Sequence, residues 1–283
     1  MSDPVRAVTD ADTGLPAGYR DSPWGTYAPT AVQRALIGLA RGTPLHRGRM
    51  RHRMTSLIAG LGSPLDVTFR DCRYRIEGRN NLMEYGMLLH PGYNTEEIDF
   101  LAAGCPPGGV AVDIGSNIGL YSLSLGRAVG PLGKVICIDA NAGVLVRLEV
   151  NARLSDLTQV QLVHSAVGDH EGRIDLGIRK GDLSIVTVQE RDGGSIPMRP
   201  LAAILSDAGV SRVDVLKIDI EGYEEKALAP YLRQATGDMV PRRIVIERGG
   251  PDGGDYVACA AEFARLGMRL AGRTRSNSLY ERL

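Results

Sequence analysis

From Gly109 to the C-terminus, the sequence has short, unbroken runs of β-branched and apolar residues that are separated by longer amphipathic stretches. Strands that are buried on both faces of a sheet show this continuous pattern, because neither face meets water. Helical stretches follow the first, second, fourth and fifth runs, an order that predicts an α/β fold with a mostly parallel sheet and helices on both of its faces. The predicted strands are residues 110–114, 134–138, 160–164, 213–218 and 243–247.

The C-terminal residues predict a different strand arrangement. A helix is expected over 256–266, followed by two short strands at 268–273 and 278–282. Strands that are joined by so short a turn run antiparallel. We therefore expect an antiparallel hairpin at one edge of the sheet, and a Rossmann-like domain that spans residues 109–283.

The first 108 residues lack the strand and helix alternation of the later chain. Residues 1–28 are rich in Asp, Thr, Gly, Pro and Ser, a composition that predicts a flexible tail. Residues 29–108 predict an N-terminal helical and strand extension, which could cap a substrate. Its expected elements are helices at 30–41, 49–61 and 95–103, and strands at 65–69 and 73–76.

Composition disfavours several classes of protein. Basic and acidic residues number 33 each, so the net charge predicts neither a nucleic-acid partner nor a membrane partner. The sequence shows no long apolar segment and no export signal, and we therefore expect a cytoplasmic protein. Its 4 cysteines are scattered without the spacing of a metal or disulfide framework, and are expected to be reduced core thiols.

The first predicted strand ends in a glycine-bearing turn, between Val110 and Gly119. Glycine lets the backbone approach a ligand at the carboxyl edge of a sheet, although a tight turn alone can also require it. Asp113 brings a carboxylate to this turn, and a carboxylate suits the cationic group of an amino acid better than a phosphate. Asp139 ends the next strand, where it can accept hydrogen bonds from both hydroxyls of an adenosine ribose.

Four segments, in this order, resemble the FkbM family of S-adenosylmethionine-dependent methyltransferases. The resemblance covers roughly residues 91–283 and implies a class I Rossmann-like methyltransferase fold with S-adenosylmethionine as cofactor. The Lys-Ile-Asp-Ile-Glu-Gly element is much more specific than a glycine turn. The segments are Val112-Asp-Ile-Gly-Ser-Asn-Ile-Gly119, Ser165-Ala-Val-Gly-Asp169, Leu216-Lys-Ile-Asp-Ile-Glu-Gly-Tyr-Glu224 and Ile244-Val-Ile-Glu247.

The resemblance also implies how the cofactor is bound. Asp113, Gly115 and Asn117 would lie against the methionine part, and Asp139 would hold the ribose. Ser165 and Ala166 would lie beside the adenine. Family members usually have Glu-Pro where this chain has Asp139 and Ala140. The residues expected to bind the cofactor are Asp113, Gly115, Ser116, Asn117, Gly119, Asp139, Ala140, Ser165, Ala166 and Asp219.

Methyl transfer to a hydroxyl requires that a proton leave the acceptor, and a carboxylate or an imidazole is the usual general base. Asp219 and Glu221 are the leading candidates, because they continue one side of the fourth strand beyond its end. Glu247 ends the next strand and could join them, and these three carboxylates could hold Mg²⁺ if the enzyme depends on a metal. His90 is a further candidate for proton transfer.

Other residues are expected near the acceptor. Lys217 has the same strand parity as Asp219, and could either contact substrate or form a structural ion pair with a nearby carboxylate. Tyr93 and Tyr223 are candidate substrate contacts. The basic run from His46 to Arg53 is read mainly as a solvated helix face, although an acidic or phosphorylated acceptor could also use its guanidinium groups.

The acceptor is expected to be a small molecule, with the methyl group placed on a hydroxyl, as in bacterial natural-product or glycoconjugate biosynthesis. This preference rests on the family resemblance. Methylation of nitrogen or of a carboxylate, and a non-catalytic cofactor-binding subunit, are the alternatives. A nicotinamide dehydrogenase is disfavoured, because the turn lacks the phosphate-binding pattern. A homodimer is possible for this kind of enzyme.

Overall fold

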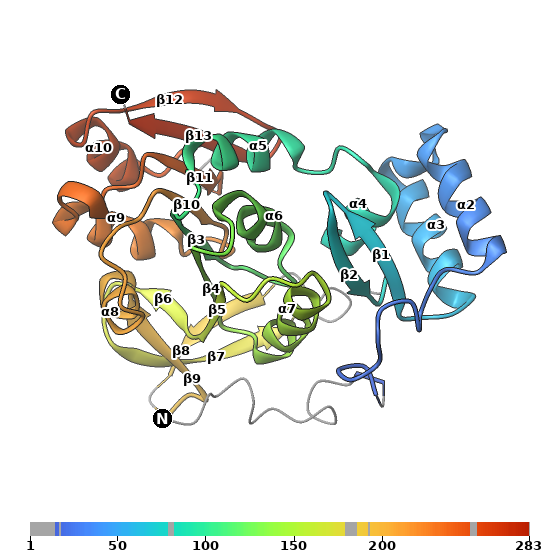
Figure 1. Cartoon of the computed structure of the whole chain (residues 1–283). Helices are drawn as coiled ribbons and strands as arrows, with labels where there is room; N and C mark the ends of the chain where they lie inside the picture. The colour runs from blue at the N-terminus through green and yellow to red at the C-terminus, as the bar shows by residue number, and fades with distance from the viewer. Residues whose placement is uncertain are drawn as a thin grey trace.

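The computed structural model describes residues 15–16, 18–78, 82–178, 186–191, 193–249 and 254–282. Its centre is a seven-stranded sheet in the order β12-β13-β11-β10-β3-β4-β5 (Figure 1). The pairs among β3, β4, β5, β10 and β11 are parallel, whereas β13 is antiparallel to both β11 and β12. The strands are β3 (Val110–Ile114), β4 (Lys134–Asp139), β5 (Val160–His164), β10 (Val215–Ile218), β11 (Arg243–Glu247), β12 (Met268–Arg273) and β13 (Asn277–Arg282).

The sheet is covered on both faces, as the continuous apolar runs predict. Successive strand residues face opposite ways, so that Ala111 packs into one core and Val112 into the other. Residues of α5, α6 and α7 belong to the first core, and residues of α8, α9 and α10 to the second. The helices are α5 (Thr95–Gly104), α6 (Leu120–Val129), α7 (Ala142–Leu154), α8 (Leu201–Asp207), α9 (Glu224–Gln234) and α10 (Val257–Arg265).

The strand order changes direction between β3 and β10. From β3 the chain moves outward through β4 and β5, and it then returns to add β10 and β11 on the other side of β3. Ile114 and Ile218 are register partners at the ends of β3 and β10. A sheet of this class binds ligands in the crevice beyond such a switch point. The expected Rossmann-like class I methyltransferase sheet, with its antiparallel C-terminal hairpin, is confirmed.

A second, four-stranded sheet lies beside β5 and was not predicted from the sequence. Its order is β6-β9-β7-β8, and its small core contains Ala166, Ile174, Ile196 and Met198. The two prolines of β9 and the three-residue length of β6 hide these strands from a pattern search. The strands are β6 (Ala166–Gly168), β7 (Gly172–Ile178), β8 (Val186–Glu190) and β9 (Ile196–Pro200).

The N-terminal extension packs against α7 at one end of the molecule (Figure 1). Thr30 caps the first helix through a reciprocal capping box with Gln33, as its position before the helix predicts. The side chains of Asn151 and Ser155 accept backbone hydrogen bonds from Arg75 and Arg73, which fastens the β2 edge to α7. The elements are α2 (Ala31–Arg41), η1 (Pro44–His46), α3 (Gly48–Gly60), β1 (Leu65–Phe69), β2 (Cys72–Ile76) and α4 (Leu82–Leu89).

Part of the segment expected to be a flexible tail is firmly attached. Arg75 is buried with Asp66, and its guanidinium also donates to the carbonyl oxygens of Tyr19, Ser22 and Pro23. Backbone N–H groups of Gly25 and Tyr27 donate to the Asp66 carboxylate. Residues 18–28 are therefore docked on the β1–β2 hairpin by buried, charge-assisted hydrogen bonds, which the composition of the segment did not reveal. Residues 1–14 lie outside the described residues.

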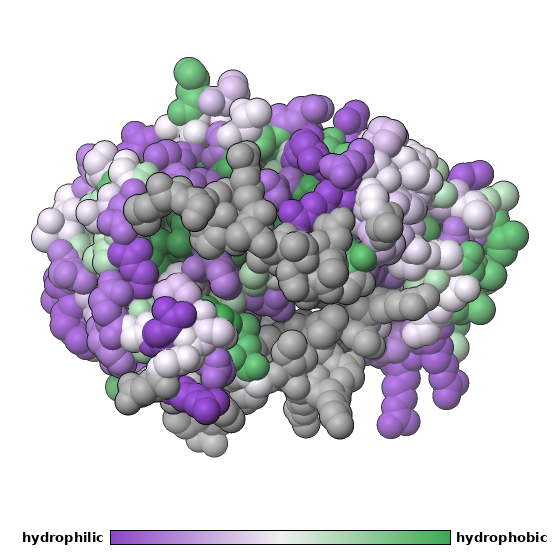
Figure 2. All heavy atoms as spheres, turned by 90° about the horizontal axis from the view of Figure 1, so that it is seen from below, coloured by the Kyte–Doolittle hydropathy of each residue, from purple (hydrophilic) through white to green (hydrophobic). Residues whose placement is uncertain are grey.

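The surface is mixed in character. Figure 2 shows hydrophilic and hydrophobic atoms interspersed, with apolar atoms exposed at the end where Figure 1 places α2 and α3. These helices contribute Val32, Leu39 and Leu57, each at least half exposed. Among the described residues, no helix is long and apolar enough to cross a membrane. All 4 cysteines are buried and unpaired, as expected.

Candidate active site

One cavity of about 450 Å³ opens beyond the carboxyl ends of β3, β4 and β10, at the switch point of the sheet. Its size falls in the range of sites for cofactors and small molecules. The cavity joins two groups of residues predicted from the sequence. Those expected at the cofactor are Gly115, Asn117, Asp139, Ala140, Ser165, Ala166 and Asp219, and those expected at the acceptor are Tyr93, Glu221, Tyr223 and Glu247.

The turn after β3 has no room for a side chain at Gly115. Its φ is 73°, and a Cβ built there would lie 1.9 Å from the carbonyl oxygen of Asp219. The backbone amides of Gly115 and Ser116 both donate to the carbonyl of Ile138. The backbones at the ends of β3, β4 and β10 therefore pack closely together. Glycine is required at position 115 both for the positive φ and because the Asp219 carbonyl occupies the place of a Cβ.

Asp139 lies at the end of β4 with its carboxylate in the cavity. One oxygen accepts the N–H of Asn117 at 2.9 Å, and the other accepts the N–H of Asn141 at 2.8 Å. Burial raises the pKa of Asp139, and these two hydrogen bonds oppose that shift. The carboxylate is thus fixed in orientation, while each oxygen keeps a lone pair for a ligand hydroxyl.

An apolar wall adjoins Asp139 and Ala140. Val144 comes from α7, Leu176 from β7 and Met198 from β9, and all three line the cavity. The second sheet therefore supplies part of the site. An apolar wall beside the carboxylate predicted to bind the ribose is suited to an adenine ring.

Three residues expected at the cofactor lie behind the cavity wall. Asp113 is fully buried, accepts a hydrogen bond from Ser122 and lies 3.5 Å from the Lys217 ammonium. Ser116 is also buried, and a Cβ at Gly119 would meet Leu123, which makes the role of Gly119 one of packing. Asp113 was expected against the methionine part, and Ser116 and Gly119 at the cofactor. In the structure all three support the turn from its core side.

Lys217 was expected as a substrate contact or a structural partner, and its position favours the second role. The ammonium is buried, does not line the cavity, and donates to the carbonyl of Gly115 at 2.8 Å. It lies 3.8 Å from the carboxylate of Asp219. Burial lowers the pKa of Lys217, but nearby carboxylates, Asp219 and Asp113 first among them, outweigh that effect and raise it. The site therefore contains a permanent buried cation.

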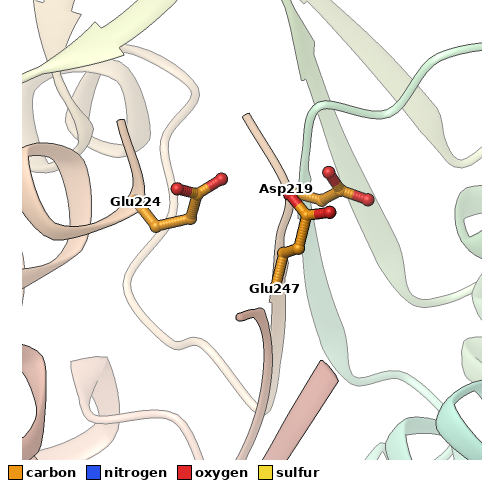
Figure 3. A group of neighbouring side chains, drawn as sticks. All are labelled: Asp219, Glu224 and Glu247. Carbon is orange, nitrogen blue, oxygen red and sulfur yellow. The ribbon is translucent and has the colours of Figure 1, made fainter. Parts of the chain in front are cut away.

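Asp219 and Glu247 form a pair of carboxyl groups on the acceptor side of the cavity. Figure 3 shows their carboxyl groups next to each other, at the ends of two neighbouring strands. Burial, the charge of Asp219 and a hydrogen bond to Asp219 raise the pKa of Glu247 to about 9. A carboxyl group with this pKa keeps its proton near neutral pH, and the Lys217 ammonium lies on the other side of the pair, 3.8 Å from Asp219.

The carboxyl groups that converge in the structure differ in one residue from the predicted metal site of Asp219, Glu221 and Glu247. In the described residues the carboxyl oxygens that converge belong to Asp219, Glu224 and Glu247, with Glu224 facing the other two (Figure 3). Glu224 takes the place expected for Glu221, but its oxygens already accept the N–H groups of Ile220 and Gly222 and bond the Tyr256 hydroxyl. These hydrogen bonds use lone pairs of Glu224 that a metal ion would need, so they reduce its capacity as a ligand for Mg²⁺.

The remaining candidates divide between the cavity and the surface. Glu221, at φ 56°, and Tyr223 line the cavity together with Tyr93. The Tyr93 ring packs directly on Gly86, where any Cβ would lie 2.5 Å from ring atoms. His90 is exposed, stacks edge-on against His46 and is not among the residues that line the cavity. Its expected part in proton transfer finds no support in this position.

The cavity also contains residues that sequence reasoning missed. Arg51 and Met83 enter from the N-terminal extension, Asn94 and Glu97 from the start of α5, and Arg275 from the β12–β13 turn. They lie far apart in the sequence, in segments without a recognisable motif. The basic run from His46 to Arg53 was the one sequence feature that pointed to Arg51, and its main interpretation was a solvated helix face.

A family model, the methyltransferase FkbM domain, matches residues 113–268, which is more than half of the chain. The chain belongs to the FkbM methyltransferase family. This membership makes the FkbM protein an S-adenosylmethionine-dependent methyltransferase, as the resemblance of its motifs implies. No curated protein matches the chain.

Solved structures resemble this FkbM methyltransferase only distantly. A SAM-dependent methyltransferase from Aquifex aeolicus is 14% identical, with coverage of 66% of this chain and 87% of that one and a TM-score of 0.38. TYW2 from M. jannaschii, solved with AdoMet, is 14% identical, with 78% and 89% coverage and a TM-score of 0.41. An rRNA methylase from Streptococcus thermophilus is 12% identical, with 66% and 95% coverage and a TM-score of 0.39.

The cavity residues fit S-adenosylmethionine. Asp139 offers a fixed carboxylate to the ribose hydroxyls, and the wall of Val144, Leu176 and Met198 suits the adenine. Gly115 also lines the cavity at the end of β3, where its backbone packs against Asp219. The charge of Asp219 suits a sulfonium cation. Following the roles predicted from the sequence, the part of the cavity around Asp139 is called the cofactor half, and the part around Asp219 and Glu247 the acceptor half.

Proposed function

We propose that this FkbM methyltransferase transfers the methyl group of S-adenosylmethionine to a hydroxyl oxygen of a small molecule, with Asp219 as the general base. The observation that carries this proposal is the pair of neighbouring carboxyl groups at the acceptor half, in which Asp219 lines the cavity, lies 3.8 Å from the Lys217 ammonium and adjoins Glu247, whose pKa is raised. Natural-product and glycoconjugate alcohols belong to the expected acceptor class.

Each partner of the pair has a separate task. The cofactor, when bound, supplies an electrophilic methyl group. Asp219 accepts the hydroxyl proton as the acceptor oxygen becomes bonded, and it is held in place by its backbone hydrogen bond to Ile114 and by Lys217. Glu247 donates a hydrogen bond to Asp219 and so orients the base. Because Glu247 is protonated, it adds no second negative charge to the acceptor half.

Alignment of the acceptor oxygen with the methyl group of the cofactor supplies much of the rate of this displacement. Tyr93 and Asn94 close the cavity beside α6, where Asn94 donates to the hydroxyl of Tyr121 at 2.9 Å. The N-terminal extension adds Arg51 and Met83 to the wall. An acceptor confined between these walls and the β-strand ends would meet few water molecules, which favours a small molecule over a large polymer as acceptor.

The test uses methyl-labelled S-adenosylmethionine with a panel of alcohols, amines and carboxylic acids. We expect labelled products from alcohols, and the label should survive mild alkaline hydrolysis, which cleaves a methyl ester but spares a methyl ether. Asp219→Asn should lower kcat by roughly 100-fold, within the usual contribution of a general base. It should leave the affinity for S-adenosylhomocysteine nearly unchanged.

Glu221→Gln provides a control, because Glu221 lines the same cavity but is not part of the carboxyl pair. It should retain more activity than Asp219→Asn. Label that appears only on amines, or only in alkali-labile products, would replace the hydroxyl assignment with nitrogen or carboxyl methylation. Tight binding of S-adenosylhomocysteine without turnover on any acceptor would favour a non-catalytic subunit.

A further inference from the structure

Two arginine side chains reach the acceptor half of the cavity. Arg51 comes from α3 and Arg275 from the β12–β13 turn, and both line the cavity with Tyr93. Among the described residues, neither side chain forms an ion pair, and the Arg51 Nε is buried without a hydrogen-bond acceptor. A buried donor without an acceptor costs free energy, and a ligand atom can remove that cost.

An acidic residue, Glu97, shares the rim with the two arginines. Its carboxylate accepts hydrogen bonds from Thr274 and Asn277, and the described residues show no ion pair between it and either arginine. Arg275 belongs to a fixed turn, because the guanidinium of Arg248 donates to the Thr274 and Arg275 carbonyls. Both arginines act on the Tyr93 phenol, and the Arg51 charge is the stronger of the two. The two cations therefore approach one region of the rim.

Their place in the chain separates them from the cofactor machinery. The family model covers residues 113–268, which include Asp139, Asp219 and Glu247. Arg51 precedes that region and Arg275 follows it. Binding of S-adenosylmethionine is common to the family, so residues outside the shared region are suited to selecting the acceptor. Of the basic run 46–53, only Arg51 enters the cavity, whereas Arg49 and Arg53 are exposed.

We propose that Arg51 and Arg275 form an anion-binding subsite that selects acceptors carrying a carboxylate or a phosphate in addition to the hydroxyl that is methylated. This inference rests on the proposed function and names its substrate class. The guanidinium groups hold the anionic group at the rim with charge-assisted hydrogen bonds, and thereby direct the hydroxyl toward Asp219. The same chemistry would bind the carboxylate of the cofactor, and the experiment separates these two sources.

The experiment measures methylation of matched probe pairs by the full-length enzyme. The pairs are hydroxybenzoates with hydroxybenzamides, hydroxy fatty acids with their amides, and sugar phosphates with the free sugars. We expect kcat/KM to be higher for an anionic member than for its neutral counterpart. Arg51→Met and Arg275→Met should each reduce that preference roughly tenfold, as expected for loss of a charge-assisted hydrogen bond. Arg53→Met, on the same helix but exposed, should leave it unchanged.

Calorimetric titration with S-adenosylhomocysteine identifies the source of the anion. Unchanged affinity in Arg51→Met and Arg275→Met assigns the subsite to the acceptor, whereas loss of that affinity assigns the arginines to the cofactor and overturns the inference. Equal use of anionic and neutral members by the wild type also overturns it. Absence of methylation throughout, in an enzyme that binds S-adenosylhomocysteine, refutes the proposed function itself. In that event, binding of the anionic probes and not of their neutral counterparts to the enzyme saturated with S-adenosylhomocysteine, measured by calorimetry, still supports the subsite.

Discussion

The close approach of Gly115 to Asp219 predicts an unusually costly glycine substitution. In Gly115→Ala the new Cβ would lie 1.9 Å from the Asp219 carbonyl oxygen, so the Asp219 peptide has to move by about 1 Å or more. A left-handed alanine costs roughly 1–2 kcal/mol, and overpacking adds about 1–3 kcal/mol. We expect Gly115→Ala to lose about 2–5 kcal/mol of the free energy of unfolding, measured by urea denaturation.

Gly209→Ala is the matched control for backbone conformation alone. Gly209 has φ 64°, close to the 73° of Gly115, and a Cβ there meets no atom within 4 Å. It should lose only about 1–2 kcal/mol. Because Asp219 moves in Gly115→Ala, that variant should also lose methyl transfer by roughly 100-fold, the effect of a displacement of this size. Equal losses of stability in the two variants, with activity retained, would refute the close contact.

Three further predictions concern other parts of the molecule. Asp139→Ala should weaken binding of S-adenosylhomocysteine at least roughly tenfold in calorimetry, because a charge-assisted hydrogen bond is removed. Arg75→Met should lose about 3–5 kcal/mol in urea denaturation, since it leaves Asp66 buried and unpaired, whereas the exposed Arg269→Met should lose under about 1 kcal/mol. Folding raises the pKa of Glu247 from 4.5 to about 9, so between these values the folded protein keeps a proton that the unfolded chain releases. The free energy of unfolding of the wild type should therefore decline from about pH 5 to 9, and that of Glu247→Gln should decline less over the same range.

The central sheet was predictable because burial on both faces leaves a direct mark on the sequence. Each parallel strand is a continuous apolar run, and the predicted strands coincide closely with β3, β4, β5, β10 and β11. The second sheet leaves a weaker mark. Ile174 and Leu176 of β7 alternate with polar or small residues, a pattern that does predict a half-buried strand. The prolines of β9 act against such a prediction.

The candidate site was predictable where the chain itself brings residues together. Asp139 and Asp219 follow β4 and β10, the two strands that flank β3, so their meeting at one edge follows from the strand order. The position of Asp113 required knowledge of which face its side chain occupies, and that face is the core side with Lys217 and Ser122. Arg51 and Arg275 depend on how the extension and the hairpin pack, which no local pattern encodes.

Lys217 links the two halves of the site. Its ammonium donates a hydrogen bond to the Gly115 carbonyl at the turn after β3 and lies beside Asp219 at the acceptor half. The buried carboxylate of Asp113 offsets the cost of burying this charge. The Asp219 carboxylate therefore has a buried cation on one side and the carboxyl group of Glu247, whose pKa is raised, on the other. In the proposed reaction a proton taken from the acceptor passes to Asp219, which has to release it before the next cycle. Because the Asp219 side chain is 37% exposed, that proton can pass to water once the product has left.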